Sequence, residues 1–381
     1  MMTTADSVAP VRRAIGLMSG TSLDGVDVAL VETDGRGVVR PGPAGAFPYA
    51  AEDRAVLHRA LDAARDLTDR TARPPALAEA EGVITRRHGQ AVNAFLASHG
   101  IARDSIDVVG FHGQTVLHRP EIGLTIQIGD GQGLADCLSL PVVHDFRARD
   151  MAEGGEGAPL VPVFHRALAE AAHLPLPLGV LNLGGVGNAT WIGRDGRLIA
   201  FDTGPGNALL DDFIRARTGL TMDTDGHFSG AGRIDIPALQ GLLEHEYFDR
   251  PPPKSLDRNA FSRAAVDRLT TNDGAATLAA FTVGAVALGA RFLPEAPGLW
   301  IVAGGGARNP TLMTLLARRL KAEVKTADAI GWSAAALEAQ AFGYLAVRAL
   351  DGLPLTFPGT TGVEQPVTGG VLARPSRAMA D

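Results

Sequence analysis

The sequence has little of several features that mark common protein classes. Cys137 is the only cysteine among 381 residues, which excludes an intramolecular disulfide and a cysteine-rich zinc site. There is no basic excess, since 35 Lys and Arg stand against 42 Asp and Glu. That balance argues against nucleic acid as a main partner, because such binding needs a basic face. No run of about 18 uninterrupted apolar residues predicts a membrane span, and residues 1–13 lack the apolar core of a signal peptide, so we expect them to form a disordered tail.

The residues that are present predict a soluble α/β protein with two lobes. The apolar content is 46%, and the length suffices for two hydrophobic cores. The 46 glycines and 24 prolines cluster in short turns between apolar runs rather than in low-complexity tracts. Without cysteine pairs or an export signal, the expected compartment is the cytoplasm.

The most informative stretch is an N-terminal hairpin. It consists of an apolar strand over 14–18, a turn of small and hydroxyl residues, and a second strand over 26–31 that Asp27 interrupts. The glycines allow backbone N–H groups to converge on an anion, and the hydroxyls add donors. Asp24 and Asp27 would repel a bare phosphate, but they suit a Mg²⁺ ion that is bound partly through water. An ordinary hairpin turn is the alternative.

The rest of the first half predicts alternating helices and strands. Ile106–Phe111 is a short buried strand, and it ends in His112-Gly113-Gln114-Thr115, at the end of a strand where open α/β sheets place ligands. A charged and then glycine-rich segment over 145–159 is typical of a passage between lobes, so we expect the first lobe to end at residue 152. The other expected elements are helices over 52–67 and 76–99, strands over 124–128 and 141–144, a helix through Leu138 and a helix over 160–172.

The second half repeats this order of elements. A strand over 178–183, a glycine turn and a strand over 189–192 precede a strand over 198–201 and a helix over 208–218. A strand over 298–303 then leads through Gly304, Gly305 and Gly306 into a helix over 310–320. We therefore expect a second lobe over 153–354, a first lobe over 14–152 that part of 355–381 completes, and an active-site cleft between them.

Asp202 is the leading catalytic candidate. It lies at the end of a buried strand in Phe201-Asp202-Thr203-Gly204-Pro205-Gly206-Asn207, just before a helix N-terminus. A carboxylate in this place suits a general base that acts on water or a hydroxyl. One alternative is a simple helix or turn cap. Another is the apolar-Asp-Thr-Gly loop of aspartic proteases, but these need two such loops, and Met222-Asp223-Thr224-Asp225-Gly226 does not supply the second.

Four further features allow both functional and ordinary interpretations. The Gly304–Gly306 turn suits a nucleotide, or it is a plain tight turn. Arg147 and Arg149 suit an anionic substrate, or they form a solvated salt-bridge patch with Asp150. His112 and His118 lack the spacing of a metal site, which favours hydrogen-bonded structural histidines. Glu338 lies among small apolar residues, where a carboxylate is costly unless it is paired or used.

Taken together, these motifs resemble one family, the anhydro-N-acetylmuramic acid kinases of the sugar kinase, Hsp70 and actin superfamily. The matching segments run in order from about residue 14 to about residue 345. They are residues 16–27, 112–115, 127–129, 145–147, 157–162, 182–185, 201–207 and 304–309. The chain departs from the family pattern at Glu156, where Gln is usual, and at Leu256-Asp257, where Thr-Gly usually follows Lys254-Ser255. The second departure puts a phosphate contact by Lys254 in doubt.

The resemblance implies two actin-like, ribonuclease H-like lobes that bind ATP, Mg²⁺ and a sugar. It implies transfer of the γ-phosphoryl group to O6 of 1,6-anhydro-N-acetylmuramic acid while water opens the anhydro ring at C1. The products are N-acetylmuramic acid 6-phosphate and ADP, in cell-wall recycling. Asp202 matches the position of the base. The implied ATP-binding residues are Gly20, Thr21, Ser22, Leu23, Asp24, Gly25, Val26, Asp27, Gly304, Gly305 and Gly306, and the implied sugar-binding residues are Gln114, Thr115, Arg149 and Glu338.

Two other functions fit the same residues. One is a kinase of this superfamily for a different sugar, and the other is an ATP-dependent sugar sensor that has lost the chemistry. Asp24 and Asp202 are both present, and their presence favours an enzyme. The expected partners are a small sugar and a second copy of the chain, with neither nucleic acid nor a membrane.

Overall fold

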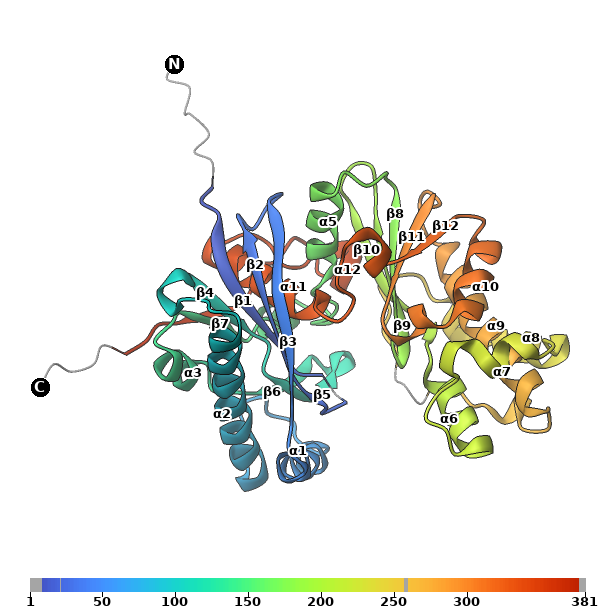
Figure 1. The fold of residues 1–381 in the computed structure, drawn as a ribbon, viewed down its shortest axis with the longest axis horizontal. Helices are drawn as coiled ribbons and strands as arrows, with labels where there is room; N and C mark the ends of the chain where they lie inside the picture. The colour runs from blue at the N-terminus through green and yellow to red at the C-terminus, as the bar shows by residue number, and fades with distance from the viewer. Residues whose placement is uncertain (1–8, 21, 257–259, 377–381) are drawn as a thin grey trace, which may run out of the picture. The chain divides into compact units, whose positions relative to one another are not determined.

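A computed structural model describes residues 9–20, 22–256 and 260–376 (Figure 1). The expected nucleotide ligand Thr21 and the family departure at Asp257 therefore lie outside the described residues. The chain divides into two compact units. The first combines residues 1–172 with residues 336–381, and the second is the continuous stretch 173–335.

The first unit is built on a six-stranded sheet in the order β13-β7-β4-β1-β2-β3. Strands β1, β2 and β3 form an antiparallel meander, β4 runs parallel to β1, β7 runs parallel to β4, and β13 closes the far edge antiparallel to β7. A separate antiparallel ribbon joins β5 to β6. The bounds are β1 Arg12–Met18, β2 Gly25–Thr33, β3 Val39–Pro48, β4 Val108–Phe111, β5 Gln114–Arg119, β6 Leu124–Ile128, β7 Val142–His144 and β13 Val371–Ala373.

The second unit has a five-stranded sheet in the order β10-β9-β8-β11-β12. Strands β8, β9 and β10 again form an antiparallel meander, β11 runs parallel to β8, and β12 runs parallel to β11. Apart from β13, the strands of the two sheets thus correspond in order and direction: β7, β4, β1, β2 and β3 match β12, β11, β8, β9 and β10. This correspondence confirms the predicted α/β fold of two actin-like lobes. The bounds are β8 Leu178–Leu183, β9 Val186–Ile192, β10 Leu198–Pro205, β11 Leu299–Ala303 and β12 Glu323–Thr326.

Helices cover both faces of the first sheet. Ile15 and Leu17 of β1 point into a core shared with α1, α2 and α3, because alternate residues of a strand face one side. On the other face α11 lies directly on the strands: a Cβ at Gly16 would come within 1.7 Å of the Ala339 carbonyl oxygen. The helices of this unit are α1 Ala51–Ala64, α2 Pro75–Ser98, α3 Gly131–Leu138, α4 Ala148–Ala152, α5 Pro162–Ala171, α11 Leu337–Leu350 and α12 Pro358–Thr361.

In the second unit α9 is the central helix. It packs against its neighbours and against β10, and its side chains join two hydrophobic clusters. By length and composition α9 is apolar enough to cross a membrane, but 72% of its most apolar window is buried inside the unit, as in the core helix of a globular domain. The helices of this unit are α6 Ala208–Thr218, α7 His227–Ala231, α8 Ile236–Leu243, α9 Thr271–Ala290 and α10 Pro310–Leu320.

The units divide at other residues than the sequence suggested. The glycine-rich segment after residue 152 belongs to the first unit, because Asp150 accepts hydrogen bonds from the Gly157 amide (2.6 Å) and the Thr361 hydroxyl (2.7 Å). Helix α11, which we assigned to the second lobe, covers the first sheet. Arg12 and Arg13, expected in a disordered tail, already pair with β2, while residues 1–8 lie outside the described residues.

Candidate functional site

The tip of the β1–β2 hairpin is a tight turn in the first unit. The Leu23 amide donates to the Gly20 carbonyl oxygen at 3.2 Å, and Leu23 itself has a left-handed backbone with φ of 56°. Its side chain is buried, which anchors the turn, whereas Ser22 and Asp24 are exposed. The turn thus presents a hydroxyl and a carboxylate to solvent. Gly25 and Val26, also expected near ATP, begin β2.

A buried hydrogen-bonded chain braces this tip from outside. The Ser19 hydroxyl bonds the Tyr49 hydroxyl (2.9 Å) and donates to Gln114 Oε1 (2.6 Å). Gln114 Nε2 donates to the Gly20 carbonyl oxygen at 3.2 Å, and the Tyr49 amide donates to the Asp24 carbonyl oxygen at 3.0 Å. Tyr49 therefore bonds both sides of the turn. The side-chain amide of Gln114, an expected sugar ligand, is hydrogen-bonded to the hairpin through both its oxygen and its nitrogen.

Asp24 and Asp27 form a carboxylate pair beside the tip. The pKa of Asp27 is raised above its ordinary value, first because its carboxyl is partly desolvated and second because Asp24 is negative. Glu338, at the start of α11, has a raised pKa for the same two kinds of reason, desolvation and then the charge of Asp27, against the lowering effect of Arg147. The negative charges of these carboxylates thus repel one another, and a bound cation would favour their ionised forms.

The pair fits Mg²⁺ better than a metal held by protein alone. Among the described residues no group of three or more His, Cys, Asp or Glu is placed to hold a metal ion. Mg²⁺ keeps several waters and commonly takes one or two carboxylates plus phosphate oxygens from its substrate. Asp24 and Asp27 supply that number of carboxylates, at the exposed end of a hairpin.

His112 is the centre of a buried polar cluster. Its Nε2 receives hydrogen bonds from Arg147 Nη2 (3.0 Å) and Gln127 Nε2 (3.2 Å), so Nδ1 carries the proton and donates to the Gly113 carbonyl oxygen at 2.9 Å. Burial, and then the charge of Arg147, hold the pKa of His112 well below its usual value. His112 is thus a neutral structural histidine, as the sequence favoured.

The cluster also holds Thr115, an expected sugar ligand, and Arg147, a candidate for binding an anionic substrate. Gln127 Nε2 donates to the Thr115 hydroxyl at 3.2 Å. Arg147 Nη1 donates to the Gly157 carbonyl oxygen at 2.7 Å, and burial lowers the pKa of Arg147 to about 10 despite nearby Glu338 and Asp150. Arg149 is exposed and is the second residue of α4. The two arginines therefore differ: Arg147 is structural, and Arg149 is accessible to a ligand.

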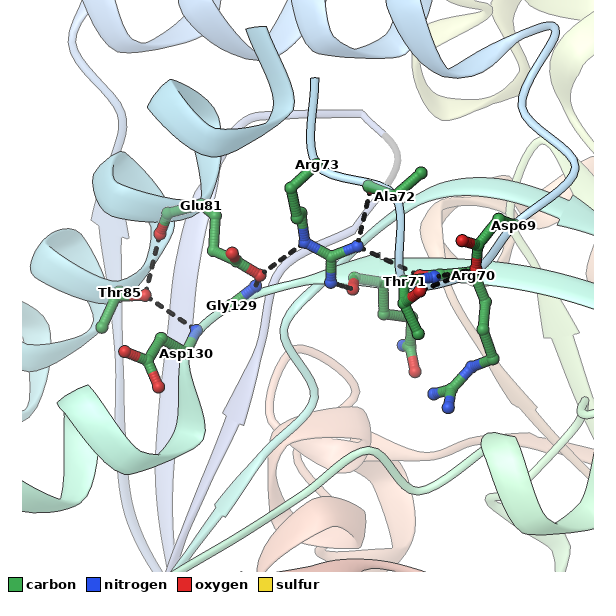
Figure 2. A network of polar contacts seen from close by, with 10 residues as sticks. Asp69, Arg70, Thr71, Ala72, Arg73, Glu81, Thr85, Gly129 and Asp130 are labelled. Atoms are coloured by element: carbon green, nitrogen blue, oxygen red, sulfur yellow. Dashed lines mark hydrogen bonds and ion pairs between the residues drawn. The ribbon is translucent and has the colours of Figure 1, made fainter. Parts of the chain in front are cut away.

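A second polar network, shown in Figure 2, connects the end of β6 to α2. Glu81 accepts from Arg73 Nε (3.0 Å) and from the Gly129 amide (3.1 Å). Arg73 Nη2 donates to the Gln127 carbonyl oxygen at 3.1 Å, and Thr85 accepts from the Asp130 amide at 3.0 Å. The network fixes the backbone of the 127–130 turn and, through Gln127, the position of Thr115.

Asp202 lies in the second unit, on β10, the edge strand of its sheet. It pairs with Asn188, and a register shift follows between Asp202 and Gly204. The Leu256 amide donates to Asp202 Oδ2 at 2.8 Å. This bond holds the carboxylate in place, and the residue is partly rather than fully buried. A helix-capping role does not describe it, because Asn207 precedes α6.

The Gly304–Gly306 turn lies against the β8–β9 hairpin of the same unit. A Cβ at Gly304 would come within 2.4 Å of Asn182 Oδ1, and one at Gly306 within 2.6 Å of Leu183 Cβ. Gly304 also has φ of 79°, which favours glycine. A pocket of about 250 Å³ opens beside the turn. Its lining combines the glycines with small and polar side chains: Gly304, Gly305, Ala307, Arg308, Thr326, Asp328, Ala334 and Ala335.

Lys254 is not placed as a phosphate ligand. Its side chain is 2% exposed, and its ammonium group donates to the Tyr247 carbonyl oxygen at 3.0 Å. Tyr247, Tyr49 and the pocket-lining Asp328 were not among the predicted site residues. Nothing around the two tyrosines in the sequence signals a role, since each acts through contacts with distant segments.

The expected site residues thus fall into two groups. The described members of 20–27, with Gln114, Thr115, Arg149 and Glu338, belong to the first unit, and Asp202 and Gly304–Gly306 belong to the second.

Comparisons with known proteins cover almost the whole chain. A family model described as anhydro-N-acetylmuramic acid kinase matches residues 12–375. The anhydro-N-acetylmuramic acid kinase of Methylobacterium nodulans is 57% identical over 373 residues, which cover 95% of this chain and 100% of that protein. The one from Rhodopseudomonas palustris strain BisB18 is 56% identical over 363 residues, with 95% and 100% covered. Among solved structures, the Acidaminococcus fermentans (R)-2-hydroxyglutaryl-CoA dehydratase component A aligns over 88% of this chain and 99% of its own at 10% identity and a TM-score of 0.47, too low for any argument.

Proposed function

The chain belongs to the anhydro-N-acetylmuramic acid kinase family, and from that premise we propose a phosphotransferase that acts on 1,6-anhydro-N-acetylmuramic acid with ATP as the phosphoryl donor. Water attacks C1 of the sugar, the C1–O6 bond breaks, and O6 takes the γ-phosphoryl group as the bond to the ADP oxygen breaks. The products are N-acetylmuramic acid 6-phosphate and ADP. Such a reaction belongs to the recycling of cell-wall amino sugars in the cytoplasm.

The observation that carries the chemistry is the placement of Asp202. Its carboxylate accepts the Leu256 amide at 2.8 Å, and the residue is partly rather than fully buried. A carboxylate held in this way is suited to take the proton of the attacking water. The phosphorylation of O6 makes that oxygen a competent leaving group, so the same step needs no separate acid on the sugar side.

The remaining residues serve binding and orientation. The hairpin turn, with the Ser22 hydroxyl and its backbone, faces the phosphates, and the pocket beside Gly304 takes the rest of the nucleotide. Arg149 and Glu338 bind the sugar. Asp24 and Asp27 hold Mg²⁺ through water. The ion, when bound, neutralises charge on the phosphate oxygens.

The test is a product assay in ¹⁸O-labelled water with the chain, ATP, Mg²⁺ and 1,6-anhydro-N-acetylmuramic acid. We expect a phosphorylated, ring-opened sugar with the label at C1, detected by mass spectrometry. A phosphorylated product with an intact anhydro ring would contradict the coupled mechanism. No ATP-dependent product would exclude this substrate, and other sugars would then separate a different sugar kinase from an inactive sensor.

Two further features belong to the proposal rather than to the family match. We expect no stable complex with nucleic acid or membranes, given the acidic balance of charge. A homodimer is the expected assembly, and sedimentation at several protein concentrations tests it.

A further inference from the structure

The backbone of Asp202 lies at an open sheet edge and has an unusual pair of partners. Because β10 is an edge strand, its outer N–H and C=O groups pair with no strand in the part of the chain that the structure describes. The Asp202 amide instead donates to the Lys254 carbonyl oxygen at 2.9 Å, and its carbonyl oxygen accepts from the Tyr247 hydroxyl at 2.5 Å. Both main-chain groups of the candidate base are therefore bound by one outside segment, residues 247–256.

Lys254 closes this arrangement into a ring. Its ammonium nitrogen donates to the Tyr247 carbonyl oxygen at 3.0 Å and lies 4.5 Å from the centre of the Tyr247 ring and 5.3 Å from that of Phe292. Asp202 thus bonds Lys254, Lys254 bonds Tyr247, and Tyr247 bonds Asp202. Burial lowers the pKa of Lys254 to about 8, with further lowering by the charges of Arg250 and Arg291. Burying a cation costs folding free energy, which indicates that Lys254 has a specific role here.

The ring has a direct consequence for the carboxylate. Two residues after Lys254, the Leu256 amide donates to Asp202 Oδ2. The direction of that amide depends on where the segment is held, and the segment is held at Lys254. One side-chain contact and two main-chain contacts of Asp202 therefore come from the same short stretch.

We propose that Tyr247 and Lys254 are positioning residues for the reaction: they clamp residues 247–256 to the edge of β10, so that the Leu256 amide orients the Asp202 carboxylate toward the attacking water. The inference rests on the proposed function, because it assumes that Asp202 is the base. A hydrogen bond to the ionised carboxylate favours that form, and a fixed direction favours proton transfer. Neither Tyr247 nor Lys254 touches the substrate in this role.

The chain offers a matched control for Tyr247. Tyr344 is also buried in the first unit, and its hydroxyl also donates to a backbone carbonyl oxygen, that of Arg36 at 3.0 Å, while it accepts from Arg348 Nη1 at 3.3 Å. Tyr247→Phe and Tyr344→Phe each remove one buried hydroxyl and leave the ring. The two changes should cost similar stability, about 1 kcal/mol each, but only the first should alter the chemical step.

The experiment measures kcat, the KM for ATP, the pH dependence of kcat/KM and the thermal midpoint of both variants. For Tyr247→Phe we expect kcat to fall about tenfold with the KM for ATP within about twofold, and the acid limb of the pH profile to move to higher pH. Tyr344→Phe should keep the wild-type kcat and profile. Equal kcat in the two variants, or a Tyr247→Phe loss that appears only in the thermal midpoint, would overturn the inference.

Lys254→Met provides a second measurement. It removes the ammonium group and keeps the apolar stem, so the ring opens without a large cavity. We expect the same fall in kcat and the same movement of the acid limb, with Lys254→Arg restoring part of both. A wild-type profile in Lys254→Met would contradict the clamp. Wild-type enzyme and Asp202→Asn run alongside: if the wild type forms no product, the proposed function has failed, whereas an active wild type with an unaffected Tyr247→Phe refutes only the clamp.

Discussion

The two units carry the same hairpin and use its tip differently. In the first unit the β1–β2 tip presents side chains, the Ser22 hydroxyl and the Asp24 carboxylate, and Tyr49 with Gln114 brace it from outside. In the second unit the β8–β9 tip is Gly184-Gly185, which presents no side chain. Its carbonyl oxygens accept the amides of Asn207 (2.7 Å) and Gly206 (3.0 Å). One tip presents a hydroxyl and a carboxylate to solvent, and the other holds the loop that follows Asp202.

The repeated topology therefore determines where each turn lies, but the residues at the tip determine which contacts the turn makes. Both tips follow the first strand of a meander. The first tip carries hydroxyl donors and carboxylates, whereas the glycines of the second carry no side chain, so that another loop approaches its backbone closely. Each of the following experiments tests one side of this comparison.

The largest effect is expected at the loop that the second tip supports. Asp202→Asn keeps the shape of the side chain but removes the base, so kcat should fall on the order of 10²- to 10⁴-fold. ATP binding, measured by calorimetry, should persist because the nucleotide residues are untouched. Turnover within about threefold of wild type would mean that another group takes the proton.

The next effect separates the two tips by stability. A Cβ at Gly206 would come within 2.2 Å of the Gly184 carbonyl oxygen, whereas for one at Gly20 the nearest atom among the described residues is Ser22 Oγ, at 3.7 Å. Gly206→Ala should therefore cost on the order of 1–3 kcal/mol of unfolding free energy, and Gly20→Ala should leave it nearly unchanged. Urea titration measures both. Equal losses would show that the first tip is packed as closely as the second.

Acid should distinguish the units as wholes. Burial lowers the pKa of His88, His118 and His165 to about 4 each and holds that of His112 well below its usual value, and all four belong to the first unit. A neutral buried histidine contributes stability that is complete above the unfolded pKa of about 6.5. That contribution is lost as the pH falls toward 4, because only the unfolded chain takes up the proton.

The tryptophans make this prediction measurable. The three tryptophans, Trp191, Trp300 and Trp332, all lie in the second unit. During an acid titration from pH 7 to 4, far-ultraviolet circular dichroism should decline before tryptophan fluorescence changes. Coincident transitions would mean that the two units unfold together or that carboxylates dominate the acid response.

The smallest effect concerns the brace of the first tip. Tyr49→Phe removes the hydroxyl that bonds Ser19 and retains the ring and the amide. We expect a loss of about 1 kcal/mol in unfolding free energy, with the KM for ATP raised a fewfold and kcat little changed. An unchanged KM would show that Gln114 alone is sufficient to hold the turn.

The elements with local signals were predictable from the sequence. Helix α6 begins after a Gly-Pro-Gly-Asn turn and ends at Gly219, which adopts φ of 78° as a left-handed cap; its bounds, and those of α10 and β8, are those predicted. Helix α9 was not predicted, because it is apolar on nearly every side and shows no amphipathic periodicity. Strand β13 was not predicted as a strand, because it is only three residues long and shows no periodic pattern.

The site was predictable where one segment supplies it and unpredictable where two segments meet. The hairpin tip and the position of Asp202 follow from short motifs. The Tyr247 hydroxyl meets Asp202 across 45 residues of chain, and no local pattern records that contact. The boundary at residue 152 failed for a related reason: a glycine-rich segment resembles a linker, but Asp150 and Thr361 hold it in the first unit.

The return of the chain to the first unit also bears on how the protein is made. On the ribosome, the second unit is complete once residue 335 has emerged, whereas the sheet of the first unit still waits for α11 and β13. Helix α11 packs closely on that sheet at Gly16 and Gly110, where a Cβ would lie 1.7 Å and 2.0 Å from carbonyl oxygens of the helix. This face of the sheet therefore stays uncovered until α11 has been synthesised. The part of the protein that is synthesised first is therefore the part that finishes folding last, and a nascent chain arrested before α11 would expose an uncovered sheet to chaperones and proteases.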